Sequence, residues 1–248
     1  NLVRDLGRSN HFIYRENINA AYVSYSRPIS KKISGQFGLR LENTLARGHQ
    51  KTTGETFTLN YTQLFPTAYL QYKMSEAHSL TMNYGRRIRR PDYENLNPFV
   101  EFLDRYTFEQ GNPYLRPQFS HNVELSHTFK NFLTTTLNYT KTNNIIQQVF
   151  EQNEQNNETF VKQANIANQS QYGISISAFK QIKNFSGNIY ANVFQNKFQG
   201  VVNGTDISIK ANTAMFNGSV SYKFKKGSSV EVSGFYRTPG VDGVLKIS

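Results

Sequence analysis

The sequence predicts an all-β protein, an antiparallel up-and-down transmembrane β-barrel with about ten strands in the chain. Long segments alternate between apolar and polar residues, which is typical of strands with one apolar face. No segment approaches 18 consecutive apolar residues, so a transmembrane helix is excluded. The low hydrophobic content of 38% and the mean hydropathy of −0.58 fit a barrel, because only alternate residues of its strands face lipid.

Ten segments carry the alternation, and most exceed the five or six residues usual for a soluble strand. In the fourth segment, for example, Leu80, Met82 and Tyr84 oppose Thr81 and Asn83. The predicted strands are 10–27, 33–48, 56–73, 78–89, 119–129, 132–149, 159–180, 185–198, 205–224 and 228–237. The pattern ends at Pro239, Gly240 and Gly243.

The seventh segment, 159–180, is too long for one regular strand. Its polar part, 165–171, indicates a bulge or a protrusion beyond the membrane.

The connections between these segments alternate in length. Short ones lie at 28–32, 75–77, 130–131, 181–184 and 225–227, longer ones at 48–55, 90–118 and 150–158, and one of medium length at 199–204. Transmembrane barrels have short periplasmic turns and longer extracellular loops, whereas a soluble sandwich has no reason to sort its loops in this way. The loop 90–118 is therefore predicted to be extracellular. The lysine-bearing turns are predicted to be periplasmic: Lys31, Lys32, Lys130, Lys183, Lys225 and Lys226.

The stretch from Arg86 to Gln118 contains four of the seven prolines: Pro91, Pro98, Pro113 and Pro117. Proline fixes its own φ, donates no backbone hydrogen bond and favours extended geometry in the residue before it. The stretch is therefore predicted to be a long, stiffened loop and not a central strand.

Two motifs in this loop resemble a known family. Residues 90–99 read RPxYxxLNPF and residues 111–117 read GNPxLxP, between one alternating strand and the next. This pattern resembles the TonB-dependent receptor barrels of bacterial outer membranes, and most closely the outer-membrane β-barrel family common in Bacteroidetes. The stretches 12–22 and 38–42 are similar to an upstream hairpin of such barrels. One departure is Gln118, where these receptors usually have Glu.

The resemblance implies energised uptake of a scarce nutrient such as a glycan, peptide, siderophore or cobalamin across the bacterial outer membrane. Such receptors have about 22 strands around a plug. Residues 1–248 are therefore expected to be a barrel segment, with the plug domain and the remaining strands outside it. Expected partners are outer-membrane lipid and lipopolysaccharide, the protein's own plug and the TonB complex, a surface lipoprotein and a small nutrient ligand. Covalent catalysis and a cofactor are not expected.

Two other functions remain open. A non-transporting adhesin or porin-like barrel would lack plug and TonB contacts. A soluble carbohydrate-binding β domain would join its apolar stripes in a sandwich core. The formal charge of +11 raises the question of nucleic acid, but the charges lie in turns and loops without a continuous basic face, so nucleic acid is not an expected partner.

Catalytic and metal-binding motifs are not found in the sequence. Cysteine is absent, and the five histidines do not form the spacing of a helical zinc site. His121 and His127 share a strand face but are about 20 Å apart along it, too far for one metal. The sequence also contains no GxSxG elbow, P-loop or GxGxxG.

The candidate substrate-binding residues all lie in or beside the extracellular loop. The cluster Arg86, Arg87, Arg89 and Arg90 faces an anionic ligand or lipopolysaccharide phosphates, or else it is ordinary interfacial charge at a strand end. Five aromatic residues either stack on a sugar or peptide ligand or pack the loop against itself. They are Tyr93, Phe99, Phe102, Tyr106 and Tyr114.

Overall fold

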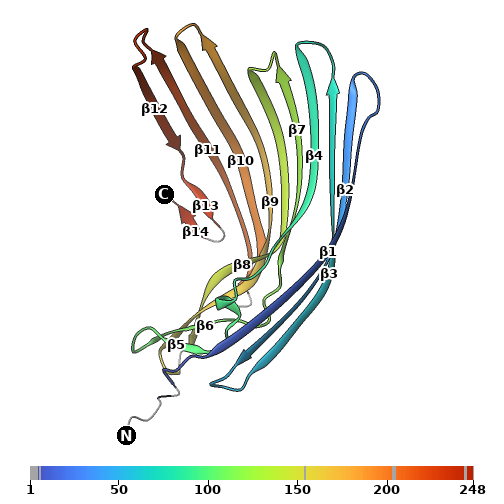
Figure 1. Ribbon diagram of the computed structural model, residues 1–248. Helices are drawn as coiled ribbons and strands as arrows, with labels where there is room; N and C mark the ends of the chain where they lie inside the picture. The colour runs from blue at the N-terminus through green and yellow to red at the C-terminus, as the bar shows by residue number, and fades with distance from the viewer. Residues whose placement is uncertain (1–4, 6, 154, 203–204, 243–244, 248) are drawn as a thin grey trace.

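The computed structural model describes residues 5, 7–153, 155–202, 205–242 and 245–247. Its ten long strands form one curved antiparallel sheet in the order β1-β2-β3-β4-β7-β8-β9-β10-β11-β12 (Figure 1). Their bounds are β1 Phe12–Pro28, β2 Ile33–Gln50, β3 Thr56–Lys73, β4 His78–Arg89, β7 Gln118–Phe129, β8 Leu133–Asn153, β9 Glu158–Ile182, β10 Phe185–Val202, β11 Thr205–Lys223 and β12 Ser229–Arg237. The predicted ten-strand meander is confirmed. No helix in these ranges is both long and apolar enough to span a membrane.

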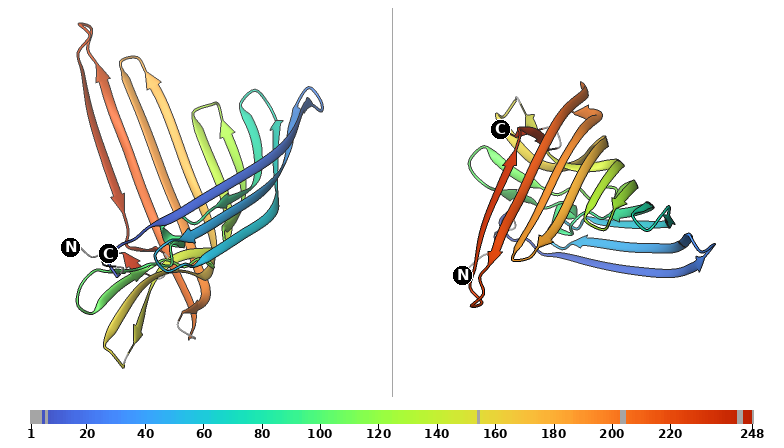
Figure 2. Two further views of the ribbon diagram at one scale, coloured as in Figure 1. Left: turned by 60° about the horizontal axis from the view of Figure 1, so that its bottom comes forward. Right: turned by 90° about the horizontal axis from the view of Figure 1, so that it is seen from above.

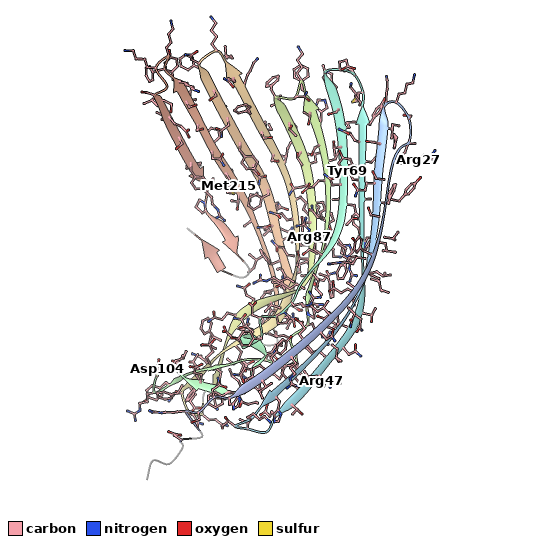
Figure 3. The ribbon with its side chains drawn as sticks, in the orientation of Figure 1. Arg27, Arg47, Tyr69, Arg87, Asp104 and Met215 are labelled. Carbon is pink, nitrogen blue, oxygen red and sulfur yellow. The ribbon has the colours of Figure 1, made fainter. Side chains whose placement is uncertain are left out.

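The five connections that were predicted to be short turns all lie at one end of the sheet, which we call the turn rim, and the 90–118 loop lies at the other end, the loop rim (Figure 1). Arg27 lies at the turn rim and Arg47 toward the loop rim of the same hairpin (Figure 3). At the turn rim Lys130 and Asn131 have φ of 46° and 56°, the left-handed pair required by a type I′ hairpin turn. The turns that carry the predicted lysines thus all lie at the turn rim.

The predictions of a long loop at 150–158 and of a loop of medium length at 199–204 are wrong. The segments 150–158 and 199–204 are mostly strand, because β8 and β9 pair out to Asn153↔Glu158, and β10 and β11 pair out to Val202↔Thr205. Residues 154 and 203–204 lie outside the described part. These strands extend past the point where the polar sequence suggested a loop, because cross-strand hydrogen bonds do not depend on side-chain polarity.

The 90–118 segment contains more regular structure than predicted. It contains a 3-10 turn, η1 (Glu94–Leu96), and a small hairpin of β5 (Val100–Phe102) and β6 (Thr107–Gln110). β6 also pairs in parallel with the outer part of β9, matching Thr107 to Thr159 and Gln110 to Lys162. The prolines still bracket these elements, so the prediction of a stiffened connection holds, whereas the prediction that the whole stretch is loop is wrong.

Two smaller differences concern β9 and the end of the sheet. β9 is one strand of 25 residues, but its pairing with β8 shifts where Thr142↔Gln169 gives way to Ile145↔Ala167 and then Ile146↔Asn165. The bulge predicted at 165–171 is therefore confirmed, while the single strand was not predicted. After β12, β13 (Gly240–Asp242) and β14 (Leu245–Ile247) form a separate hairpin in the region where the strand pattern was predicted to end. Gly243 lies outside the described residues.

The sheet has one apolar and one polar face. We call the face on which the 90–118 loop packs the inner face, and the opposite one the outer face. The register places an apolar row across the outer face, and each member of this row is exposed. The row consists of Leu70, Met82, Leu125, Leu137, Ile174 and Val193. Such an exposed apolar band is the surface that lipid covers in a membrane barrel.

Short polar side chains line the inner face and pair across strands. The hydroxyls of Ser126 and Thr136 lie 2.8 Å apart, and the Thr140 hydroxyl donates to Asn122 Oδ1 at 2.7 Å. A soluble sandwich would bury the apolar row against a second sheet. The long strands instead form a single layer with that row exposed, so the soluble carbohydrate-binding alternative is wrong.

Within the described residues, β1 and β12 each pair with one neighbour and not with each other. Seen from above, the sheet forms an open, curved wall (Figure 2). An unpaired strand edge exposes a row of backbone donors and acceptors, so the wall is a part of a barrel and not a closed one.

Candidate functional site

The GNPxLxP motif fixes the loop by backbone contact. A Cβ on Gly111 would lie 2.4 Å from the Asn97 carbonyl oxygen and 2.8 Å from that of Asn95, so only glycine fits against this part of the chain. The next residue, Asn112, donates its backbone N–H to Asn95 O at 2.6 Å and its side-chain amide to Gln163 O at 3.2 Å. The two halves of the loop are thereby joined to each other and to β9.

The leucines of the two motifs form the interior of the loop. Leu96 and Leu115 are each only 1% exposed, although they lie far from any apolar run in the sequence. Asn165 of β9 holds the same part of the loop by its side-chain amide, which accepts from Arg116 N at 2.8 Å and donates to Arg116 O at 2.9 Å. The loop is therefore packed and hydrogen-bonded onto the wall.

Gln118 has a structural role. Its side chain is buried, and its Oε1 accepts a hydrogen bond from the backbone N–H of Ile146 at 2.9 Å. Ile146 lies at the register shift between β8 and β9, where the regular ladder is interrupted. A glutamate would offer the same acceptor, so the departure from the family pattern leaves this contact intact.

Arg90 lies in a charged cluster on the inner face and not in free solution. Its guanidinium donates to the carboxylate of Glu42 in β2 and to Thr44 Oγ1 at 3.2 Å. Its Nε lies 3.7 Å from a carboxylate oxygen of Glu16 in β1. The Glu42 side chain is 5% exposed and also lies 3.3 Å from Arg40 Nη1. A buried carboxylate needs such partners, so Arg90 ties the start of the loop to two strands.

Arg86 occupies the place where β3 and β4 separate. Pairing between these strands ends at Thr67↔Gly85, and Arg86 then donates to the unpaired carbonyl of Leu64 at 2.6 Å and to Gln63 Oε1 at 2.7 Å. Its guanidinium also lies 4.5 Å from the centre of the Phe119 ring. The predicted arginine cluster is thus divided: Arg86 and Arg90 bind the wall, whereas Arg87 and Arg89 are exposed.

A polar cavity of about 460 Å³ opens where the loop meets β1 and β9. The residues that contribute to it include Asn97 and Phe99 of the loop, Asn10 just before β1, Phe12 at the start of β1, and Gln163 of β9. Its other lining residues are Tyr93, Glu94, Asn95, Glu101, Glu109, Gln110, Gly111, Val161 and Lys162.

Buried amides hold this cavity in shape. Gln50, which is fully buried, donates from Nε2 to both Asn10 Oδ1 and Asn97 Oδ1 at 2.9 Å. Asn97 also donates to Asn10 Oδ1 at 3.1 Å. Segments far apart in sequence therefore meet in one fixed amide network.

A second hollow of about 510 Å³ lies on the inner face of the wall. Gln36, Tyr69, Arg87, Asn122 and Glu124 are among its lining residues. The lining of this hollow contains both arginine and glutamate side chains. In the lining of the first cavity, by contrast, carboxylates outnumber the single lysine.

The predicted loop aromatics have different environments. Tyr93 and Phe99 line the cavity, and Phe99 is buried. Tyr93 donates from its hydroxyl to Glu94 Oε1 at 3.0 Å, and this hydrogen bond to a carboxylate raises the pKa of Tyr93. Phe102 and Tyr106 are half-exposed on the β5–β6 hairpin, and Tyr114 is 82% exposed.

The β5–β6 hairpin ends in a turn organised by Asp104, which projects from the loop rim (Figure 3). Its Oδ1 accepts from Tyr106 N at 2.8 Å, and this bond lowers the pKa of the Asp104 carboxyl. Phe102 packs edge-on against Phe108 with ring centres 5.8 Å apart, so it packs the hairpin against itself.

Several site residues were not predicted from the sequence: Asn10, Phe12, Gln110, Lys162 and Gln163. They come from segments that meet only through the parallel pairing of β6 with β9 and the docking of the loop on β1. No local pattern marks them. The histidines were also not predicted to meet, yet His78 Nδ1 and His127 Nε2 lie 3.0 Å apart on the outer face. No group of three metal-binding side chains occurs in the described residues.

A model of the outer membrane protein beta-barrel family matches residues 1–248. The chain belongs to this family. It is therefore an outer-membrane β-barrel protein, as the strand pattern and the loop motifs predicted. None of the curated proteins compared with the chain matches it.

Solved structures with the same fold include transporters and a receptor. The FrpB iron transporter from Neisseria meningitidis (F3-3 variant) aligns with a TM-score of 0.65 at 12% identity, over 96% of this chain and 34% of its own. The hemophore receptor HasR of Serratia marcescens gives 0.57 at 13% identity, over 90% and 51%. The copper transporter OprC gives 0.54 at 9% identity, over 89% and 42%. The family member described here thus spans about a third to a half of the chains it matches.

Proposed function

We propose that this chain supplies part of the wall and the extracellular ligand-binding loop of a TonB-dependent receptor that imports a scarce nutrient. The observation that carries the proposal is the 90–118 loop, which is docked onto the polar inner face at the rim opposite the short turns. A loop held there lies between the external medium and the lumen. Structures with this fold include two transporters and a receptor, which supports the same role.

In this proposal the wall does no covalent chemistry. The exposed apolar row contacts membrane lipid, and lipopolysaccharide surrounds the loop rim. The inner face, with Arg87 and Arg89, faces a plug domain that belongs to the longer protein and that TonB energises from the periplasm. Binding at the cavity beside Tyr93 then couples to movement of the plug. The exposed hairpin bearing Phe102 and Tyr106, together with Tyr114, is the part of the loop open to a ligand or a surface lipoprotein.

The test uses the full-length protein in its own cells. A strain lacking the receptor gene and a strain lacking TonB are grown with each of a panel of nutrients as the limiting source. The strain without the receptor gene is expected to grow poorly on at least one nutrient. The strain without TonB is expected to show the same growth defect on that nutrient. Uptake by the receptor that persists without TonB would overturn the proposal and favour the porin-like alternative.

A complementing gene distinguishes loss of function from loss of folding. The Gly234→Ala variant serves as a control because open space surrounds a Cβ at this position. It should restore growth fully. A Gly111→Val variant places a larger side chain against Asn97 O and should fail to restore growth while still giving an outer-membrane band whose mobility changes on heating.

A further inference from the structure

An aromatic row lies on the inner face beside the polar cavity and contributes two of its rings to the cavity lining. The rings of Phe57, Phe12, Tyr14 and Tyr93 follow one another with centres 6.2, 6.4 and 6.4 Å apart. Phe12 and Tyr93 also line the cavity. The row therefore combines residues of β3, β1 and the loop into one aromatic track beside a polar site.

Gly48 provides the room for the outermost ring. A Cβ at this position of β2 would lie 2.1 Å from Phe57 Cε1, so the Phe57 ring lies against the bare backbone of Gly48. The missing side chain allows the ring to lie close to the wall. The aromatic row thus depends on backbone space and is not merely a result of aromatic residues being common in strands.

The polar side of the cavity suits hydroxyl groups. Its lining includes five side-chain amides and the carboxylates of Glu94, Glu101 and Glu109. Amides both donate and accept hydrogen bonds, and carboxylates accept strongly, so together they can satisfy a ligand group that does both. The buried Gln50 network holds Asn10 and Asn97 in place before any ligand arrives.

The charge of the cavity disfavours an anionic ligand. Lys162 is the one cationic side chain in its lining, and its ammonium already lies 2.7 Å from a Glu151 carboxylate oxygen. None of Arg86, Arg87, Arg89 and Arg90 lines it. An anion would therefore approach three carboxylates without a free cation to compensate.

We infer that the cavity and its aromatic row bind a neutral oligosaccharide. The rings stack on the apolar faces of successive sugar units, and the amides and carboxylates pair with the sugar hydroxyls. The inference rests on the proposed function and names the substrate class of the same site. It also differs from the anionic-ligand role predicted for the arginine cluster, because Arg86 and Arg90 hold the wall and the loop.

The experiment measures binding calorimetrically with purified full-length receptor in detergent. The probes are neutral hexasaccharides built from glucose, mannose, galactose or xylose, with hexagalacturonate and a ferric tris-catecholate siderophore as anionic counterparts. At least one neutral hexasaccharide is expected to bind, and neither anionic probe. Failure of all the neutral probes would overturn the inference, as would binding of an anionic probe at the same site.

Matched variants place the binding. Tyr93→Ala should weaken binding of the neutral probe about tenfold, which corresponds to loss of one aromatic stack. Tyr93→Phe keeps the ring and should bind like the unmodified receptor. Tyr25→Ala removes an exposed tyrosine of β1 near the turn rim, outside the cavity lining, and should have no effect. Equal losses in Tyr93→Ala and Tyr25→Ala would overturn the assignment of the site.

The binding assay can refute the oligosaccharide without refuting the transport proposal, and the growth test can do the reverse. A receptor that binds only the siderophore but supports TonB-dependent growth refutes the oligosaccharide and leaves the transporter intact. A receptor that binds a neutral hexasaccharide but takes it up without TonB refutes the transport mechanism and leaves the site intact.

Discussion

The wall and the 90–118 loop are specified in different ways. In the wall, many weak and interchangeable contacts repeat along every strand, such as the apolar outer row and the hydroxyl pairs of the inner face. In the loop, single residues each make one contact that no neighbour can supply: Gly111 against Asn97, Gln118 to Ile146 and Arg90 to Glu42. The wall should therefore tolerate most single substitutions within a face, whereas the loop should not.

The largest effect is expected at Arg90. Replacing Arg90 with Met leaves the buried Glu42 carboxylate without its main partner, and removing one partner of a buried ion pair costs about 3 kcal/mol or more of unfolding free energy. The measurement is guanidinium unfolding of the full-length protein in detergent. Adding Glu42→Gln should recover much of the loss. Arg105→Met at the exposed hairpin tip is the control, and an equal loss there would contradict the role of the cluster.

Neighbouring residues of β8 should show how sharply the two faces differ. Leu137→Arg puts a charge into the outer row and should cost about 2–4 kcal/mol if it lies near the bilayer midplane. Thr136→Arg, one residue away, points to the inner face and should cost about 0.5 kcal/mol or less. Refolding into lipid vesicles at graded urea concentration measures both. Similar losses at the two positions would contradict the assignment of the faces.

A smaller effect is expected at Gln118. Gln118→Leu leaves the Ile146 N–H without its acceptor, which costs about 1–3 kcal/mol. Gln118→Glu keeps an acceptor oxygen and should be nearly neutral. Hydrogen exchange followed by mass spectrometry should show faster exchange around Ile146 in the leucine variant only. Faster exchange in both variants would mean that the amide of glutamine itself is required.

The smallest effect concerns pH at the tip of the β5–β6 hairpin. The pKa of Asp104 is lowered by its hydrogen bond from Tyr106 N, so the ionised carboxylate stabilises the turn. That contribution is full above the ordinary pKa of 3.8 and is lost as pH falls through the lowered pKa. The measurement is the hydrogen-exchange rate of the Tyr106 amide in Asp104→Asn divided by the same rate in the unmodified protein. This ratio should approach one in acid. A ratio independent of pH would contradict the effect.

The sequence by itself determined the strands of the wall. Strand residues alternate strictly between two environments, so local pattern and tertiary environment give the same answer. The bounds of β3 and β4 agree with their predicted ranges. Proline and glycine likewise marked the loop and its ends, because their backbone restrictions are local properties.

The tertiary structure alone decided what the loop does. Hydrogen-bond pairing extended β8 to β11 into polar sequence, and the parallel β6–β9 contact joined residues about fifty positions apart. The partners of Arg86 and Arg90, and the meeting of Asn10, Asn97 and Gln163, follow from where the loop docks. A side chain's partner depends on the path of the whole chain, and no periodicity in the sequence encodes that path.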